Sequence, residues 1–142
     1  MKKRLKRLRL RVSKVVLVVD KDHDTRGAIQ YGLEYLYPTK YNVICVSNEK
    51  RCFDLLNNFC NPDVILLNIM LPGMDGWSIY EKLKRGPDFK HIPIVFLSEK
   101  KDKVARTAGE TLQELYLEKP FAISELVKTI NELKAEKIKV EV

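Results

Sequence analysis

The sequence of 142 residues lacks the apolar runs that mark membrane and secreted proteins. No stretch is long enough to span a bilayer, and the run Val15 to Val19 near the start is too short for the core of a signal peptide. We therefore expect a cytoplasmic protein. No internal repeat or low-complexity linker is visible, and the length suits one domain with its own hydrophobic core.

Cysteine and histidine are also scarce. Three cysteines, an odd number, match neither a paired zinc spacing nor a disulfide pattern, so we expect free thiols packed as small apolar groups: Cys45, Cys52 and Cys60. His23 and His91 have no second histidine or cysteine at ligand spacing. We expect both to be exposed, His23 in the turn after the first strand and His91 in the turn before the fourth.

Acidic residues are absent from the first 14 positions, which hold eight lysines and arginines. The whole chain carries a net charge of +7, but without those eight residues 18 basic side chains face 19 acidic ones. Seven of the eight lie in a tail, residues 1–13, so the excess charge belongs to this tail and not to the domain. Leucines are interleaved in this tail, so it suits nucleic acid, an anionic membrane surface or a disordered solubilising role, and the pattern leaves all three open.

After the tail, apolar runs of strand length alternate with amphipathic stretches, which predicts parallel strands covered by helices. The first and third runs are apolar on both faces, as central parallel strands are. The five predicted strands are Val15 to Asp20, Asn42 to Val46, Val64 to Asn68, Ile92 to Ser98 and Leu115 to Leu117.

Each predicted strand is followed by a predicted helix. The first is capped by Asp24 or Thr25 and stops near Pro38, and the second is capped by Ser47 or Asn48. The third carries an apolar stripe and frays at Gly86-Pro87, the fourth covers residues 103–112, and the last has four apolar residues on one face: Leu126, Val127, Ile130 and Leu133.

The domain should cover residues 14–135, between the basic tail 1–13 and a C-terminal tail 136–142. Residues 138–142 alternate in polarity, so they either fray or add as a strand to another chain. We expect a stand-alone domain without an appended output domain.

Four predicted strands end in polar residues, which converge if the strands are parallel. The first ends in Asp20, followed by Lys21 and Asp22, two others end in Asn68 and in Ser98, and the fifth leads into Lys119-Pro120. The four blocks that carry these residues are VVDKDHDTR, PDVILLNIMLPGMDGW, IPIVFLS and YLEKPF.

In order and separation these blocks resemble the receiver domain of two-component response regulators. The resemblance implies an α/β fold, a flavodoxin-like (βα)5 doubly wound parallel sheet with strand order 2-1-3-4-5. It places the phosphoacceptor at residue 68, phosphoryl-binding groups at Ser98 and Lys119, a metal ligand at Asp20 and an aromatic switch at Tyr116. Many members have a Gly-Ala pair before the fifth strand where this chain reads LQELYLEK, so we expect a reshaped surface there.

Two residues depart from the family pattern at the chemical centre: Lys21 replaces the second acid and Asn68 replaces the acceptor aspartate. A carboxamide is neutral and far less nucleophilic than a carboxylate, so Asn68 should not form an acyl phosphate. The formal charges of Asp20, Lys21, Asn68 and Lys119 sum to +1, so Mg²⁺ binding should be weak or absent. Asp22 or Glu99 would have to supply negative charge to rescue it.

Without a phosphoryl group, Lys119 should form a salt bridge with Asp20 and Ser98 a local hydrogen bond. Lys21 either pairs with Asp20 where the metal would lie or extends into solvent, and both interpretations stay open. Tyr116 suits a switch and simple packing equally well.

We therefore expect a degenerate receiver domain that is not an enzyme. Its expected partners are signalling proteins such as a histidine kinase or a downstream effector, and a homodimer is a further possibility. A second hypothesis is a working phosphorelay receiver in which Asn68 was introduced to lock the unphosphorylated form, although Lys21 argues against a single locking change. A third is a binder of nucleic acid or anionic membrane through residues 1–13.

Overall fold

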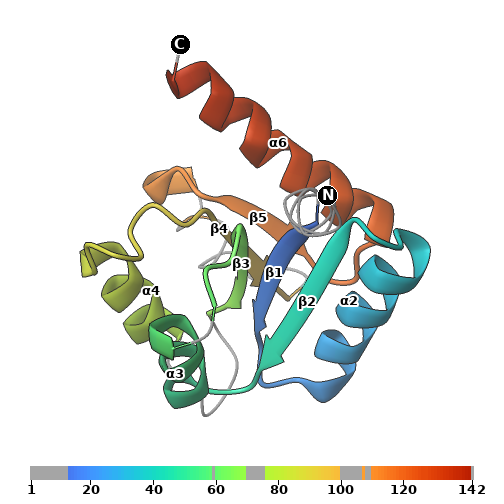
Figure 1. Ribbon diagram of the computed structural model, residues 1–142, viewed down its shortest axis with the longest axis horizontal. Coiled ribbons are helices and arrows are strands. Elements are labelled where there is room, and N and C mark those ends of the chain that lie inside the picture. Colours follow the sequence, from blue (N-terminus) through green and yellow to red (C-terminus); the bar gives the residue numbers. More distant parts are fainter. Residues whose placement is uncertain (1–12, 59, 70–75, 100–106, 108–109, 142) are drawn as a thin grey trace, which may run out of the picture.

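A computed structural model describes residues 13–58, 60–69, 76–99, 107 and 110–141, with side chains described as far as residue 133 (Figure 1). The elements, in chain order, are β1 (Lys14–Val19), α2 (His23–Leu36), β2 (Tyr41–Val46), α3 (Glu49–Asn58), β3 (Val64–Asn68), α4 (Gly76–Arg85), β4 (Ile94–Ser98), β5 (Leu115–Glu118) and α6 (Ile123–Glu141).

The five strands form one parallel sheet in the order β2-β1-β3-β4-β5, which confirms the predicted fold class and strand order. Helices α3 and α4 cover one face of the sheet, and α2 and α6 cover the other (Figure 1). The connections are crossovers, as parallel strands require, so every strand ends at the same edge of the sheet.

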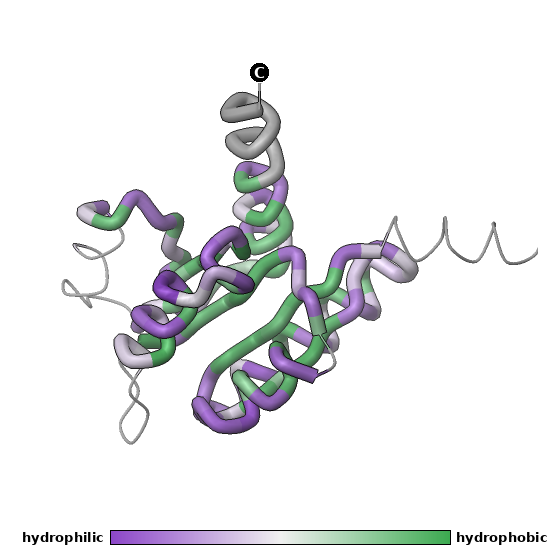
Figure 2. The backbone as a smooth tube through the Cα atoms, turned by 60° about the vertical axis from the view of Figure 1, so that its left-hand side comes forward, coloured by the Kyte–Doolittle hydropathy of each residue, from purple (hydrophilic) through white to green (hydrophobic). Residues whose placement is uncertain are grey.

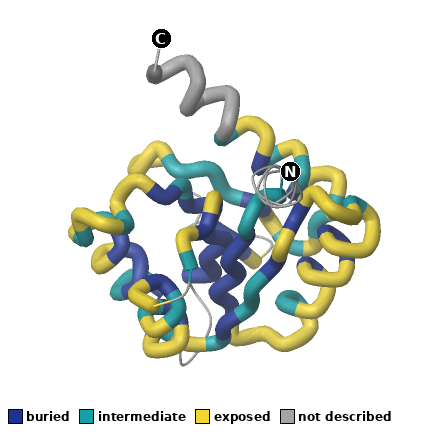
Figure 3. Tube along the Cα trace, viewed as in Figure 1, coloured by how far each residue is buried: buried dark blue, intermediate teal, exposed yellow. Residues whose placement is uncertain are grey.

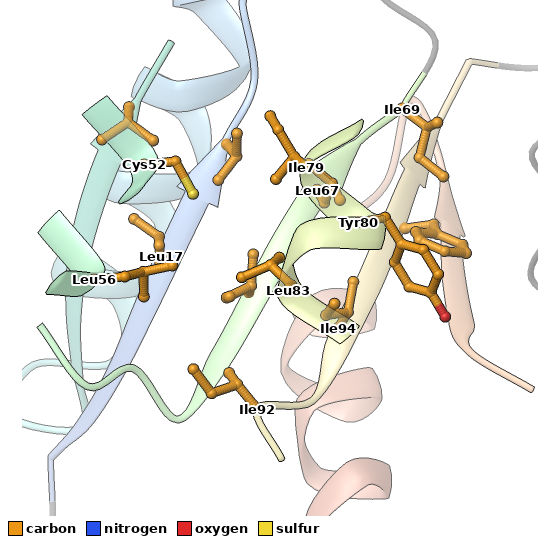
Figure 4. Packing of buried hydrophobic residues seen from close by; sticks show 14 residues of the cluster. Leu17, Cys52, Leu56, Leu67, Ile69, Ile79, Tyr80, Leu83, Ile92 and Ile94 are labelled. Carbon is orange, nitrogen blue, oxygen red and sulfur yellow. The ribbon is translucent and has the colours of Figure 1, made fainter. Parts of the chain in front are cut away.

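Side chains of the central strands alternate between two hydrophobic clusters. Leu17 of β1 and Leu67 of β3 point toward α3 and α4, while Val18 and Leu66 point toward α2 and α6. Figure 4 shows the first cluster, in which α3 and α4 lay their apolar stripes on the sheet. Both faces of β1 and β3 are therefore buried, which explains why these strands are apolar along nearly their whole length.

The start of α2 differs from the prediction, because Asp22 caps the helix and not Asp24 or Thr25. Asp22 Oδ1 accepts the backbone N–H of Asp24 at 3.1 Å, and Thr25 Oγ1 donates to Asp22 Oδ2 at 2.7 Å. The hydrogen bond from Thr25 holds the pKa of Asp22 below its usual value. His23 is consequently the first residue of the helix and not a turn residue, although it is exposed as expected.

Other predictions for the termini of elements have mixed outcomes. Asn48 caps α3 as predicted, since its Oδ1 accepts the backbone N–H of Arg51 at 2.9 Å. The prediction that residues 138–142 fray or form a strand is wrong for 138–141, because α6 continues to Glu141. Residues 1–12 and most of the predicted helix 103–112 lie outside the described residues, so the boundaries of the tails stay predictions.

The three cysteines are free thiols, as predicted, and Cys52 is completely buried. Burial raises the pKa of the Cys52 thiol to about 12. His91 lies exposed in the turn before β4, also as predicted. Within the described ranges, no helix has the length and apolar character needed to cross a membrane.

Candidate functional site

Three buried polar side chains lie at the ends of β1, β3 and β4. Asp20, Asn68 and Ser98 are 0%, 1% and 2% exposed, and within the described residues they are the buried members of the polar and charged class. In Figure 3 the ends of the central strands are dark blue, the colour of buried residues. The register of the parallel sheet brings these residues together, as the sequence predicted.

The Asp20 carboxylate is held by three donors. Its Oδ1 accepts the backbone N–H of Asp22 at 2.9 Å, and its Oδ2 accepts the Lys119 ammonium at 2.9 Å and the Asn68 amide Nδ2 at 3.3 Å. The Arg26 guanidinium donates to the backbone carbonyl of Asp20 at 2.8 Å, which stabilises the turn after β1. The predicted salt bridge between Lys119 and Asp20 is therefore present.

Lys119 connects the buried carboxylate with the surface. Its backbone N–H donates to the Ser98 carbonyl at 2.8 Å, and its peptide bond to Pro120 is cis. Its side chain is 12% exposed and also contacts Glu99 Oε1 at 3.3 Å, on a carboxylate that is 57% exposed. Asp20 and Glu99 thus share one ammonium group, and the site holds a carboxylate–ammonium–carboxylate chain that leads outward.

Gly76 fixes the approach of α4 to the end of β3. A Cβ at this position would lie 2.8 Å from the Asn68 carbonyl oxygen and would overlap the Cα of Ile69. The first turn of α4 therefore contacts the backbone of the site directly, which any residue larger than glycine would prevent. No pattern in the sequence marks this close approach.

Lys21 lies on the exposed rim of the site, and the buried ammonium beside Asp20 belongs to Lys119. Asp22 is also exposed, and its carboxylate caps α2. Both candidates for extra negative charge therefore already have partners, Asp22 in the helix cap and Glu99 in the ion pair with Lys119.

These side chains do not fit Mg²⁺, which requires oxygen ligands in octahedral geometry. Both oxygens of Asp20 already accept hydrogen bonds, and the Asn68 amide turns a donor toward that carboxylate. Across the described part of the chain, no three carboxylate, histidine or cysteine side chains group in a way that could hold a metal ion. The arrangement stabilises one buried carboxylate with a lysine and leaves the acceptor position without a nucleophilic oxygen anion.

Tyr116 is half buried and packs beside an aromatic cluster on the α4 side of the sheet. It pairs with Phe96 in the β4–β5 register, and Phe96 contacts the rings of Tyr80 and Trp77 at centroid distances of 5.2 and 6.2 Å. Packing therefore accounts for its position, and a switching role stays a prediction.

The segment before β5 makes a contact that sequence reasoning missed. Glu114 Oε1 pairs with the Lys84 ammonium at 3.1 Å and accepts from the Tyr80 hydroxyl at 3.5 Å. Burial, together with Glu114, raises the pKa of Tyr80 to about 12. Glu114 belongs to LQELYLEK, where the sequence departs from many receivers, so this departure ties the start of β5 to α4.

Comparisons with known proteins agree with this geometry. Residues 16–131 match the family model of the response regulator receiver domain. The probable transcriptional regulator ycf29 of Porphyra purpurea is 34% identical over 119 residues, which cover 83% of this chain and 55% of the relative. The sensor histidine kinase TmoS of Ectopseudomonas mendocina is 32% identical over 125 residues, which cover 87% of this chain and 12% of the relative. The chain thus spans between about an eighth and about half of these two relatives.

Solved structures show the same fold. A putative response regulator from Chloroflexus aurantiacus J-10-fl superposes with a TM-score of 0.74 at 26% identity, covering 87% of this chain and 98% of that one. The receiver domain of the Francisella response regulator 1452 superposes with a TM-score of 0.72 at 27% identity, covering 88% and 99%.

Proposed function

Because this chain belongs to the response regulator receiver family, we propose that it acts in two-component signalling as a binding module that needs no phosphoryl group. The proposal assigns it no catalytic step. Its folded surface, and not a covalent change at the site, is what its partners recognise.

The observation that carries the proposal is the buried hydrogen bond between Asn68 and Asp20. The Asn68 amide donates to Asp20 Oδ2 at 3.3 Å, at the strand end where the family pattern has a carboxylate. An amide oxygen carries no negative charge, so it attacks phosphorus poorly. The amide is also a good partner for Asp20, because a carboxylate at residue 68 would place two like charges in a buried space.

Lys21 supports the same conclusion from the metal side. Phosphoryl transfer to a receiver depends on a divalent cation to neutralise the phosphoryl charge. Lys21 adds a positive charge at the rim of a site whose buried carboxylate already has a cation in Lys119. Both departures oppose the same reaction, which a single locking substitution would not explain.

The partners we propose are those that two-component pathways supply, a histidine kinase or a downstream effector, in the cytoplasm. One relative is named a sensor histidine kinase and another a probable transcriptional regulator, so sequences like this one occur in proteins named for each of these roles. The basic tail is a separate proposal: residues 1–13 carry charge suited to nucleic acid or an anionic membrane.

The test is incubation of the intact chain with acetyl phosphate and Mg²⁺, followed by intact-mass spectrometry. We expect no phosphorylated species, and Trp77 fluorescence should not respond to Mg²⁺ in the millimolar range. A phosphorylated peptide that maps to any aspartate of this chain would refute the proposal.

Two variants separate the contributions of the departures. Asn68→Asp alone should stay unphosphorylated, and Lys21→Asp combined with Asn68→Asp should recover phosphorylation if both residues silence the site. Recovery in Asn68→Asp alone would favour the hypothesis that a working receiver lost only its acceptor. The matched control is Ser98→Ala added to the variant with Lys21→Asp and Asn68→Asp. It removes a phosphoryl-binding group from the site and leaves the charge of the site unchanged.

A further inference from the structure

Gly27 is a glycine that the folding of this chain does not explain. It lies in the second turn of α2, where glycine is less favourable than alanine. A Cβ at Gly32 would overlap Ile123, and one at Gly76 would overlap the backbone of β3, so both of those glycines are required by packing. A Cβ at Gly27 would meet no described atom within 4 Å. The small size of this residue therefore gives the isolated domain no packing advantage.

The helix face around Gly27 is exposed and carries two tyrosine rings. Tyr31 and Tyr35 are 64% and 66% exposed, and their rings stack on each other with centroids 4.9 Å apart and an interplanar angle of 10°. Ala28 is exposed beside them, and a groove of about 480 Å³ runs past Gly27 and the two tyrosines, with Gln30 and Glu34 completing its lining. In Figure 3, α2 is mostly yellow, the colour of exposed residues.

Solvent-facing helix surfaces are normally charged. Figure 2 shows many hydrophilic residues, in purple, along the helices, whereas the row formed by Gly27, Tyr31 and Tyr35 carries no charge. Glu34, next to this row, accepts the backbone N–H of Val43 at 3.3 Å, which directs its carboxylate toward the edge strand β2. The uncharged row is therefore continuous along the helix.

We propose that this row of α2 is the contact surface of a symmetric dimer, in which a second copy of the chain packs its own α2 antiparallel to the first. Residues 27, 31 and 35 follow the i, i+4 spacing that forms one ridge of a helix. In a two-fold pair, the Tyr31–Tyr35 stack of each copy lies beside Gly27 of the other copy. The same ridge therefore supplies both the projecting tyrosine rings and the space at Gly27 that receives them. Because a Cβ at Gly27 would meet no described atom within 4 Å, a ring of the other copy has room to approach the backbone there.

The charges at the two ends of α2 favour the antiparallel direction. Asp24 is exposed in the first turn, and Lys40 is exposed just beyond the C-terminal end. An antiparallel pair brings Asp24 of each copy toward Lys40 of the other, whereas a parallel pair would place like charges together. The opposed helix dipoles add to the same preference.

This dimer should be weak, and it does not rest on the proposed function. A helix of 14 residues is about 21 Å long, so a single helix pair buries less than the area of a standard protein interface. The surface lies on the helix face and leaves Asp20, Asn68 and Lys119 untouched. Failure of the dimer would therefore say nothing about phosphorylation, and the reverse is also true.

Sedimentation velocity of the intact chain tests the proposal over a range from about 10 µM to about 1 mM, which brackets weak association. We expect the wild type to shift from monomer to dimer and Gly27→Arg to weaken association at least tenfold. The space around Gly27 accommodates the new side chain within one copy, and arginine favours helix more than glycine. The thermal midpoint of Gly27→Arg should therefore be no lower than that of the wild type, which separates loss of the dimer from unfolding.

The matched control is Asn57→Arg, which adds the same charge to an exposed position of α3 and should dimerise like the wild type. The direction of pairing is tested by Asp24→Lys and Lys40→Asp, each of which should weaken the dimer, while their combination should restore it. A wild type that stays monomeric, or a Gly27→Arg variant that dimerises normally, would overturn the proposal. No recovery in the combined variant would overturn the antiparallel arrangement.

Discussion

Replacing Lys119 with methionine should strongly destabilise the fold, because it removes the cation from a carboxylate with no exposed surface. Lys119 Nζ lies 2.9 Å from Asp20 Oδ2, and the two side chains are 12% and 0% exposed. At this distance and an effective dielectric constant of about 20, the attraction is about 6 kcal/mol, and it is offset in the native protein by the desolvation of both charges.

Removing one partner of a buried pair typically costs about 3 to 5 kcal/mol, because the desolvation of the other partner is no longer compensated. Asp20 keeps two donors in the variant, the backbone N–H of Asp22 and the amide of Asn68. We therefore expect a loss near the lower limit, about 3 kcal/mol, which corresponds to a decrease in thermal midpoint of about 6 to 12 °C.

The measurement is urea unfolding followed by circular dichroism and by the fluorescence of Trp77, the single tryptophan. Lys82→Met is the control, since Lys82 pairs with Glu49 at 2.8 Å but the two side chains are 58% and 36% exposed. This exposed pair is shorter than the buried one, yet its loss should cost at most about 1 kcal/mol. Comparing the two variants shows whether the loss in free energy of unfolding depends on the burial of the ion pair or on its N–O distance.

A second arm repeats Lys119→Met in an Asp20→Asn background, where no buried carboxylate remains. There the change should cost much less than in the wild type, and the difference measures the coupling between the two residues. Equal losses for Lys119→Met and Lys82→Met, or an unchanged loss in the Asp20→Asn background, would refute the reasoning.

Three further predictions use the same unfolding assay or simple chemistry. Gly76→Ala should lose about 1 to 3 kcal/mol, because its Cβ would overlap the end of β3; a stability equal to that of the wild type would mean that α4 can shift at no cost. Burial raises the pKa of Tyr80 from 10.0 to about 12, so the contribution of Tyr80 to stability is present below pH 10 and is lost as the pH rises through 12. The free energy of unfolding of Tyr80→Phe should therefore decline less steeply over this range than that of the wild type. Identical pH profiles of the two proteins would contradict the assignment. Cys52 is buried and burial raises its pKa to about 12, so it should be the last thiol to react with a maleimide in native protein. Peptide mass mapping of the labelled protein measures this order. Early labelling of Cys52 would mean that α3 opens readily.

The fold was predictable because local patterns and family motifs agreed. The strands β1 and β3 contain unbroken apolar runs of strand length, a pattern typical of parallel strands that are buried on both faces. The convergence of Asp20, Asn68, Ser98 and Lys119 followed from the same logic, since parallel strands end at one edge. The salt bridge between Lys119 and Asp20 was also predictable, because a buried carboxylate needs a cation.

Details that depend on small differences in backbone path were not predictable. Aspartate is a favourable N-cap residue, so both Asp22 and Asp24 are candidates to cap α2. Asp22 is the one that caps it, because the turn in which the backbone N–H of Asp22 donates to Asp20 Oδ1 places Asp22 at the start of the helix. The contact between Glu114 and Lys84 joins segments 30 positions apart, and nothing local marks either residue as a partner. Residues 138–142 carry an alternating pattern, yet 138–141 continue α6, which begins in the folded domain.

The amino-acid sequence alone decides that the phosphoacceptor carboxylate and the second acidic residue are missing. The covalent identity of a side chain does not depend on the fold, so residue 68 is an amide and residue 21 a lysine in every conformation. Which cation compensates Asp20 is decided only by the tertiary structure. Lys21 is adjacent to Asp20 in the chain, whereas Lys119 is 99 positions away, and the distant lysine supplies the buried ammonium. The reason is that β3, β4 and β5 pack side by side, so the end of β5 brings Lys119 to the buried carboxylate, while residue 21 is exposed.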